Sequence, residues 1–306
     1  MSTSLSSPDR AGVSPIGDSP ARRGSAFLFR HAKVRLALLL SAPLFWLGLV
    51  YIAALAALLI TALWTVDSFT GEILIKWNTD NLWTVLSESL YHAVTLRTVS
   101  AAVFVTIIDV LIALPIAFVM AKVASLSLRR ALVVAILMPL WVSYLVKAYA
   151  WRSILAQDGI IDWILNPFGL ASPGYGMEGA IITLGYLWLP FVILPIYTAL
   201  ERVPDSLIDA SSDLGAGSFT TFRKIVLPLI APGIIAGSIF SFSLTLGDYI
   251  AVKIVGGATQ TLGTLVYANV GTANNLPLAA AVALIPLAII FIYLAAVRRT
   301  GALNNL

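Results

Sequence analysis

The sequence predicts an all-α membrane protein with six transmembrane helices. Of its 306 residues, 59% are hydrophobic and only 11% are charged, whereas soluble domains are roughly half apolar and a quarter charged. The charged residues are also gathered between long apolar runs. Each run is long enough to cross a hydrocarbon core about 30 Å thick, so the chain belongs in a lipid bilayer.

The apolar runs predict helices over residues 36–64, 97–121, 131–150, 179–200, 225–247 and 276–297. Asp109, near the middle of the second run, is an ionisable residue at membrane depth and therefore a functional candidate. Prolines lie inside most of the runs and can bend a helix where neighbouring groups satisfy the freed carbonyl. Taken together, they indicate bent helices around a pathway.

Polar segments flank and interrupt this bundle. Residues 1–35 are rich in Ser, Pro and Arg and predict a disordered basic tail. Residues 36–299 form the six-helix domain, with a polar loop at 201–224, and 300–306 form a short C-terminal tail. With both termini in the cytoplasm, 14 of the 19 Lys and Arg residues lie on the inner side, as the positive-inside rule requires. The net charge of +4 therefore reflects sidedness and does not indicate nucleic-acid binding.

The loop at 201–224 predicts a short helix of its own. Pro204 and Asp205 favour a helix start, and Gly215 favours the matching stop. Three carboxylates at intervals of four residues would form an acidic ridge: Asp205, Asp209 and Asp213. Three apolar residues can share another face: Leu207, Ile208 and Leu214. Such a helix calls for a partner with basic groups and a groove, although an amphipathic connector at the membrane surface is the alternative.

A longer pattern covers this loop and the start of the next helix. Asp209-Ala210-Ser211, three residues, Gly215, nine residues, Ile225, one residue and Leu227-Pro228 follow in order. This segment resembles the EAA loop of bacterial ABC importer permeases, EAA-x3-G-x9-I-x-LP, with Asp209 in place of Glu and Ser211 in place of Ala. The resemblance implies a type I (MetI-like) importer permease with a cytoplasmic coupling helix. The resemblance implies that Asp209, Ala210 and Gly215 form or shape the contact with the ATPase and that Pro228 sets the re-entry of the next helix. The acidic ridge adds Asp205 and Asp213 to these candidate coupling residues.

Four further stretches resemble the spermidine/putrescine permeases: 138–141 (MPLW), 143–146 (SYLV), 148–151 (AYAW) and 246–249 (LGDY). The resemblance implies a polyamine as substrate. Because polyamines are polycations with methylene stems, their pathway should offer acids and aromatic faces. The candidate pathway residues are Asp109, Trp141, Tyr144, Asp248 and Tyr249. Two alternatives stay open: an interfacial aromatic belt for the Trp and Tyr residues, and a structural role for Asp109.

The chain itself lacks the motifs of an ATPase. It has no G-x-x-x-x-G-K-[ST] segment for nucleotide phosphates, no G-x-S-x-G segment and no cysteine, and neither His31 nor His92 has a second ligand at metal-binding spacing. We therefore expect a non-enzymatic subunit with no catalytic residue, metal or cofactor of its own. The resemblance implies as partners a second permease chain, a cytoplasmic ATPase dimer that binds ATP and Mg, and a periplasmic substrate-binding protein, at a bacterial inner membrane.

Other classes of function remain as alternatives. An ion-driven secondary transporter could use Asp109 as its proton or sodium site, and a membrane scaffold would transport nothing. Within the importer class, related permeases share the EAA loop, so anions, ferric iron and other small solutes are alternative cargoes. Vesicle uptake distinguishes the classes by its dependence on ATP or on an ion gradient.

Overall fold

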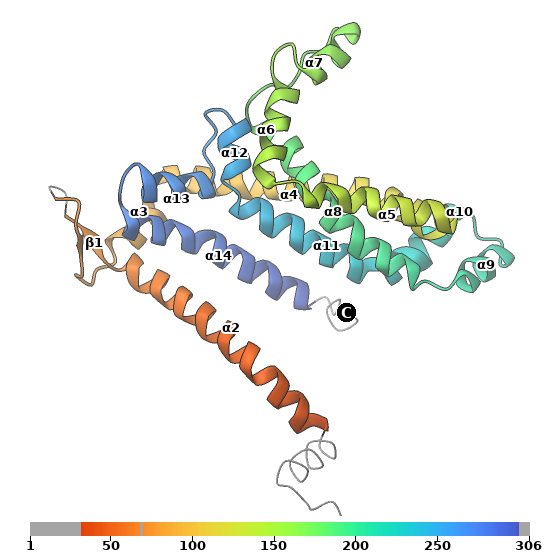
Figure 1. The fold of residues 1–306 in the computed structure, drawn as a ribbon, viewed down its shortest axis with the longest axis horizontal. Helices are drawn as coiled ribbons and strands as arrows, with labels where there is room; N and C mark the ends of the chain where they lie inside the picture. The colour runs from red at the N-terminus through yellow and green to blue at the C-terminus, as the bar shows by residue number, and fades with distance from the viewer. Residues whose placement is uncertain (1–31, 68–69, 300–306) are drawn as a thin grey trace, which may run out of the picture. The chain divides into compact units, whose positions relative to one another are not determined.

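The computed structural model describes residues 32–67 and 70–299 (Figure 1). The chain divides into two units, residues 1–57 and 58–306, and α2 (Ala32–Ala62) crosses the boundary between them. Because α2 begins at Ala32, the last four residues of the predicted tail, 32–35, are helical. The rest of that tail, and the C-terminal tail at 300–306, lie outside the described residues.

After α2, the described chain forms two short strands and then helices. The elements follow in the order β1 (Thr65–Val66), β2 (Ile73–Leu74), α3 (Asp80–Ser87), α4 (Ser89–Phe118), the π-helix η1 (Val119–Val123), α5 (Leu126–Trp141), α6 (Tyr144–Leu155), α7 (Ile160–Leu165), the 3-10 helix η2 (Asn166–Phe168), α8 (Met177–Glu201), α9 (Asp205–Asp213), α10 (Ser218–Thr221), the π-helix η3 (Phe222–Val226), α11 (Leu227–Gly247), α12 (Ile250–Val255), α13 (Leu262–Gly271) and α14 (Leu276–Arg299). The two short strands pair antiparallel, Thr65 with Leu74 and Val66 with Ile73.

Five helical segments in the described ranges are long and apolar enough to cross a membrane: Leu39–Ala62, Ser89–Val123, Met177–Glu201, Ser218–Gly247 and Leu276–Arg298. The pair Leu126–Trp141 and Tyr144–Phe168 makes a sixth if the two count as one bent span, and the prediction of six helices agrees on that count. The second span begins at Ser89, eight residues before the predicted start. Arg97 lies inside the helix, where its guanidinium donates to the backbone carbonyl of Gln260 at 3.4 Å, so this charge does not end the span.

The helix predicted over 131–150 is broken in the structure into α5 and α6. The helix axis turns by 96° between α5 and α6, as Figure 1 shows. Val142 (ψ 137°) and Ser143 (ψ 138°) take extended backbone conformations, and Pro139 has no N–H to bond the preceding turn. Hydropathy cannot register this break, because the residues on both sides of it are equally apolar.

The centre of the second unit is the packing of α8 against α4 and α11. Small residues let these helices approach closely, as is common in membranes. At Gly233, for example, an added Cβ would lie 2.6 Å from the Cβ of Ala199 and from the carbonyl oxygen of Pro195. The buried side chains of this packing continue to the helix ends nearest α9: Ala113, Ala117, Met120, Val192, Ile196, Leu200, Val226 and Ile230. This continuous core connects the middle of the bundle to α9.

Candidate functional site

The helix α9 lies between the end of α8 and the start of α10. It begins directly after Pro204 and ends at a glycine stop, since Gly215 has a φ of +79°. The N–H of Gly215 donates to the carbonyl of Ser212 at 2.9 Å, and that of Ala216 to the carbonyl of Ser211 at 3.0 Å. These two bonds form a Schellman motif, which satisfies the carbonyls at the helix end. The helix therefore starts and stops where the sequence predicts.

One face of α9 is held against its own chain by three residues at intervals of three. Asp205 accepts a hydrogen bond from Lys122 at 2.6 Å and forms an ion pair with it. Ile208 packs against the core formed by α4, α8 and α11. The buried hydroxyls of Ser211 and Thr221 lie 2.8 Å apart, within hydrogen-bonding distance. Because residues three apart share a helix face, these contacts fix the orientation of α9 about its own axis.

The opposite face of α9 is exposed. Asp209, Ala210 and Asp213 are exposed, and the Leu214 side chain is 89% exposed. The predicted acidic ridge is thus divided: Asp205 pairs inside the chain, while the other two aspartates have no ion pair among residues 32–67 and 70–299. The predicted apolar face is divided in the same way, because Ile208 packs inward while Leu207 and Leu214 are exposed.

Pro228 is the second residue of α11 and is exposed. It lacks the N–H that a helix would use at this position, and the π-helical η3 directly precedes α11. It also lines a cavity of about 590 Å³ between α8 and α11, together with Pro195, Thr198 and Arg202. Pro228 therefore lies where the chain re-enters the bundle after α9 and α10.

Two basic residues, one from η1 and one from α5, hold the α8–α9 junction, and neither role was predicted from the sequence. Lys122, in η1, donates through Nζ to the Val203 carbonyl at 2.6 Å as well as to Asp205. Arg129, in α5, donates through Nη2 to the Ala121 carbonyl at 2.8 Å and through Nη1 to Glu201 at 3.4 Å. Their position at the ends of apolar runs is the only sequence signal of these roles, and it predicts sidedness rather than a contact.

Asp109 lies in the centre of the bundle and is 1% exposed. The Ser241 hydroxyl, from α11, donates to its Oδ2 at 2.6 Å. Its Oδ1 faces α8 at Gly185, where an added Cβ would be 3.2 Å away, and has no hydrogen-bond partner in the described part of the chain. Asp109 thus joins three packed helices, which favours the structural alternative left open by the sequence.

Tyr144 and Asp248 are brought into direct contact from α6 and the end of α11. The Tyr144 hydroxyl donates to Asp248 Oδ2, and the Ala251 N–H donates to Oδ1 at 2.9 Å. Burial raises the pKa of the Asp248 carboxyl above its ordinary value, while the hydrogen bonds from Tyr144 and the backbone oppose that shift. Trp141 does not join this pair: it lies on α5, across the bend, and is 84% exposed.

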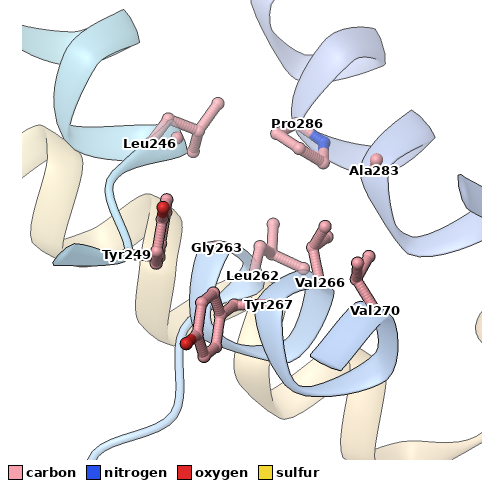
Figure 2. A pocket seen from close by; sticks show the side chains of 10 residues that line it. Leu246, Tyr249, Leu262, Gly263, Val266, Tyr267, Val270, Ala283 and Pro286 are labelled. Atoms are coloured by element: carbon pink, nitrogen blue, oxygen red, sulfur yellow. The ribbon is translucent and has the colours of Figure 1, made fainter. Parts of the chain in front are cut away.

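Tyr249 lines a cavity of about 350 Å³ formed by α11, α13 and α14 (Figure 2). Its ring stacks on that of Tyr267, with centroids 5.0 Å apart and an interplanar angle of 19°. The Lys253 ammonium lies 3.7 Å from the centroid of Tyr267. The rest of the lining is largely apolar, including Leu246, Val266, Val270 and Pro286. Neither Tyr267 nor the cation–π role of Lys253 was predicted from the sequence, although Lys253 follows Tyr249 at a helical spacing of four.

Comparisons with known proteins agree with this architecture. Residues 89–300 match the family described as binding-protein-dependent transport system inner membrane component. The inner membrane ABC transporter permease protein YdcU of Escherichia coli (strain K12) is 40% identical over 317 residues, covering 99% of this chain and 98% of the relative. The spermidine/putrescine transport system permease protein PotB of Haemophilus influenzae is 33% identical over 207 residues, covering 66% of this chain and 72% of the relative.

A solved structure shares the fold at low sequence identity. It is a crystal structure of a bacterial alginate ABC transporter in complex with an alginate pentasaccharide-bound periplasmic protein. The match has a TM-score of 0.62 and 16% identity, and it covers 90% of this chain and 97% of the other. The predictions of the family, the all-α fold and the non-enzymatic role are confirmed. The chain belongs to the binding-protein-dependent transport system inner membrane components, as a multi-pass, non-catalytic permease subunit of an ABC importer in which separate subunits hydrolyse ATP.

Proposed function

We propose that this permease subunit imports polyamines such as spermidine and putrescine, and that α9 is the helix through which a cytoplasmic ATPase drives it. The observation that carries the coupling role is the exposed face of α9. Asp209 and Asp213 have no ion pair among the described residues, and Leu214 is 89% exposed at the glycine stop. A partner groove with basic groups at its rim would bury the leucine and pair the two carboxylates.

The family supports the other proposed partners. We propose that α9 and both termini lie in the cytoplasm, and that the importer comprises a second permease chain, an ATPase dimer that binds ATP and Mg, and a periplasmic substrate-binding protein. Closure of the ATPase would pull on α9 and open the bundle outward to accept substrate. Hydrolysis of ATP would then return the bundle to its inward-open state.

The names of the relatives support the polyamine assignment, because PotB of Haemophilus influenzae is named as a spermidine/putrescine permease. The Tyr249–Tyr267 pair adds chemical support, since the Tyr267 ring already holds an ammonium group, that of Lys253, at 3.7 Å. Lys253 and Arg152 line the adjoining cavity of about 510 Å³ and would repel a polycation. Transient contacts on these rings suit a pathway whose selectivity comes mainly from the binding protein.

The coupling role is tested in the full importer reconstituted in lipid nanodiscs. The variants Asp209→Lys and Leu214→Asp should each weaken ATPase association, because one reverses a charge and the other removes the apolar contact of the exposed face. Asp80→Lys is the matched control, since Asp80 is also exposed but lies on α3, away from α9. ATPase retention equal to wild type in both α9 variants would overturn the docking role.

The substrate is tested by uptake of radiolabelled spermidine into proteoliposomes. Uptake should require the binding protein outside and ATP inside, and it should persist when proton and sodium gradients are collapsed. Calorimetric titration of the binding protein with spermidine, putrescine, molybdate and ferric citrate provides the second measurement. Binding of an anion or iron in place of polyamines would contradict the polyamine assignment. Uptake that needs only an ion gradient would overturn the importer mechanism.

A further inference from the structure

The junction between α8 and α9 is held by an internal cation, and this cation comes from η1, the π-helical segment that directly follows α4. Lys122 donates to the Val203 carbonyl and to Asp205, both at 2.6 Å. We propose that Lys122 is a positioning residue of the importer: it fastens α9 to the inner end of α4, so that a displacement of α9 moves α4. This inference rests on the proposed docking of α9 to the ATPase.

The Lys122 contact differs from an ordinary surface ion pair. The side chain of Lys122 is 10% exposed and that of Asp205 is 79% exposed, so the lysine is almost enclosed while the aspartate reaches in from solvent. Exposed ion pairs contribute little because water screens them and both side chains are mobile. Here the ammonium has a second acceptor, the Val203 carbonyl, in the turn between α8 and α9. One group therefore sets the position of the turn and of the first residue of α9.

A second basic residue holds the same junction from the other side. Arg129, in α5, donates to the Ala121 carbonyl at 2.8 Å and to Glu201 at 3.4 Å. Ala121 precedes Lys122 in η1, and Glu201 is the last residue of α8. The ends of α4, α8 and α9 are thus joined by two cations, and Lys122 is the one that contacts α9 itself.

The point of attachment also suits a transfer of movement. Lys122 lies in η1, one of the two π-helical segments that end α4 and begin the α11 span; π-helical turns are frequent at functional sites. The Phe118 and Phe222 rings meet edge to face between these segments, with centroids 6.4 Å apart. Met120 and Ala121 belong to the buried core that continues into the bundle. A pull on Lys122 therefore acts on packed side chains and not on a flexible loop.

The test uses the complete reconstituted importer and measures two quantities for each variant: ATPase retention on the permease, and spermidine taken up per ATP hydrolysed. Lys122→Met keeps most of the length of the side chain but removes its charge and both hydrogen bonds. We expect uptake per ATP to fall by roughly fivefold or more, the lower end of the usual coupling between two sites, while ATPase retention stays unchanged. Asp205→Ala should act in the same direction.

Three further variants separate positioning from general stability. Lys122→Arg keeps the charge and the donors and should restore most of the coupling. The exchange of both residues, Lys122→Asp with Asp205→Lys, restores the ion pair without the bond to Val203. Its uptake per ATP hydrolysed should be higher than that of either single charge reversal. Lys224→Met is the matched control, because Lys224 is an exposed lysine in η3 without an ion pair among the described residues.

The outcomes distinguish this inference from the docking proposal. If Lys122→Met and Asp205→Ala both leave uptake per ATP as in wild type, while Asp209→Lys still weakens ATPase retention, Lys122 has no positioning role and the docking stands. If Asp209→Lys and Leu214→Asp leave ATPase retention unchanged, the docking itself fails. A loss of ATPase retention in Lys122→Met that Lys122→Arg does not repair also overturns the positioning role.

Discussion

At the level of single residues, two acidic side chains in the second unit are each bonded to a hydroxyl from another helix. Ser241 donates to Asp109, and Tyr144 donates to Asp248. A buried acceptor that loses its donor costs free energy, because no water replaces the lost bond. These two pairs therefore hold helix neighbours together in addition to the apolar packing.

The variant Ser241→Ala should lower the free energy of unfolding by about 1 kcal/mol, the usual range for a hydrogen bond between membrane helices. The reason is that Asp109 Oδ1 already lacks a partner in the described chain, so removing Ser241 leaves the whole carboxyl unsatisfied. Unfolding of the purified protein in detergent measures the change. Ser153→Ala is the control, since Ser153 is exposed and bonds only within its own helix, and an equal loss in both variants would contradict the expectation.

The variant Asp109→Asn should keep spermidine uptake near the wild-type rate. Asparagine keeps an oxygen that can accept from Ser241 and removes the ionisable proton, so a structural role survives the change while an ion-coupling role does not. Uptake with and without an imposed proton gradient is the measurement. Loss of uptake in a variant that still folds and inserts would contradict the structural role and indicate that Asp109 takes part in transport.

At the level of elements, α9 shows which features local sequence predicts well. Its bounds follow from Pro204 and Gly215, because proline at a helix start and glycine at a helix end act within one turn. The pairing of Asp205 with Lys122, 83 residues away in the chain, has no local signature. The prolines predicted bent helices, but the position of the break at Val142 was not predicted, because two residues of extended backbone leave hydropathy unchanged.

The variant Gly215→Ala should reduce spermidine uptake per ATP hydrolysed while leaving membrane insertion intact. A side chain at a φ of +79° costs about 1–2 kcal/mol, although nothing lies within 4 Å of the added Cβ, so backbone strain alone would loosen the end of α9. Gly217→Ala is a close control, because it also has open space around its Cβ but a φ of −71°. Equal spermidine uptake per ATP hydrolysed in the two variants would exclude a role for the glycine stop.

At the level of the whole molecule, the described spans confirm the membrane architecture, while the sidedness of the chain stays a prediction. The sequence supplied the number of spans because hydropathy acts over whole helices. It supplied the sidedness through the distribution of Lys and Arg. Which helices meet, such as α8 with α4 and α11, could not be predicted, because it depends on small residues and shape far apart in the chain.

The absence of cysteine from the sequence permits a direct test of sidedness. Leu214→Cys and Trp163→Cys introduce single thiols at side chains that are 89% and 77% exposed. With α9 in the cytoplasm and α7 outside, a membrane-impermeant maleimide added to intact spheroplasts should label position 163 and spare position 214. The reverse pattern would invert the topology. Both measurements use cells that lack the ATPase subunit, because the proposed docking would itself cover position 214, and permeabilised cells, in which both positions should then react, provide the control.

The two faces of α9 contact different chains under the proposed docking, so we expect their side chains to change with different partners. Changes at Asp205 and Ser211 must be matched within the same gene, at Lys122 and Thr221, because these side chains contact one another. Under the proposed docking, changes at Asp209, Asp213 and Leu214 must be matched in the ATPase gene. Transplanting only this outer set from another permease should therefore redirect the subunit to a foreign ATPase, without any change inside the membrane.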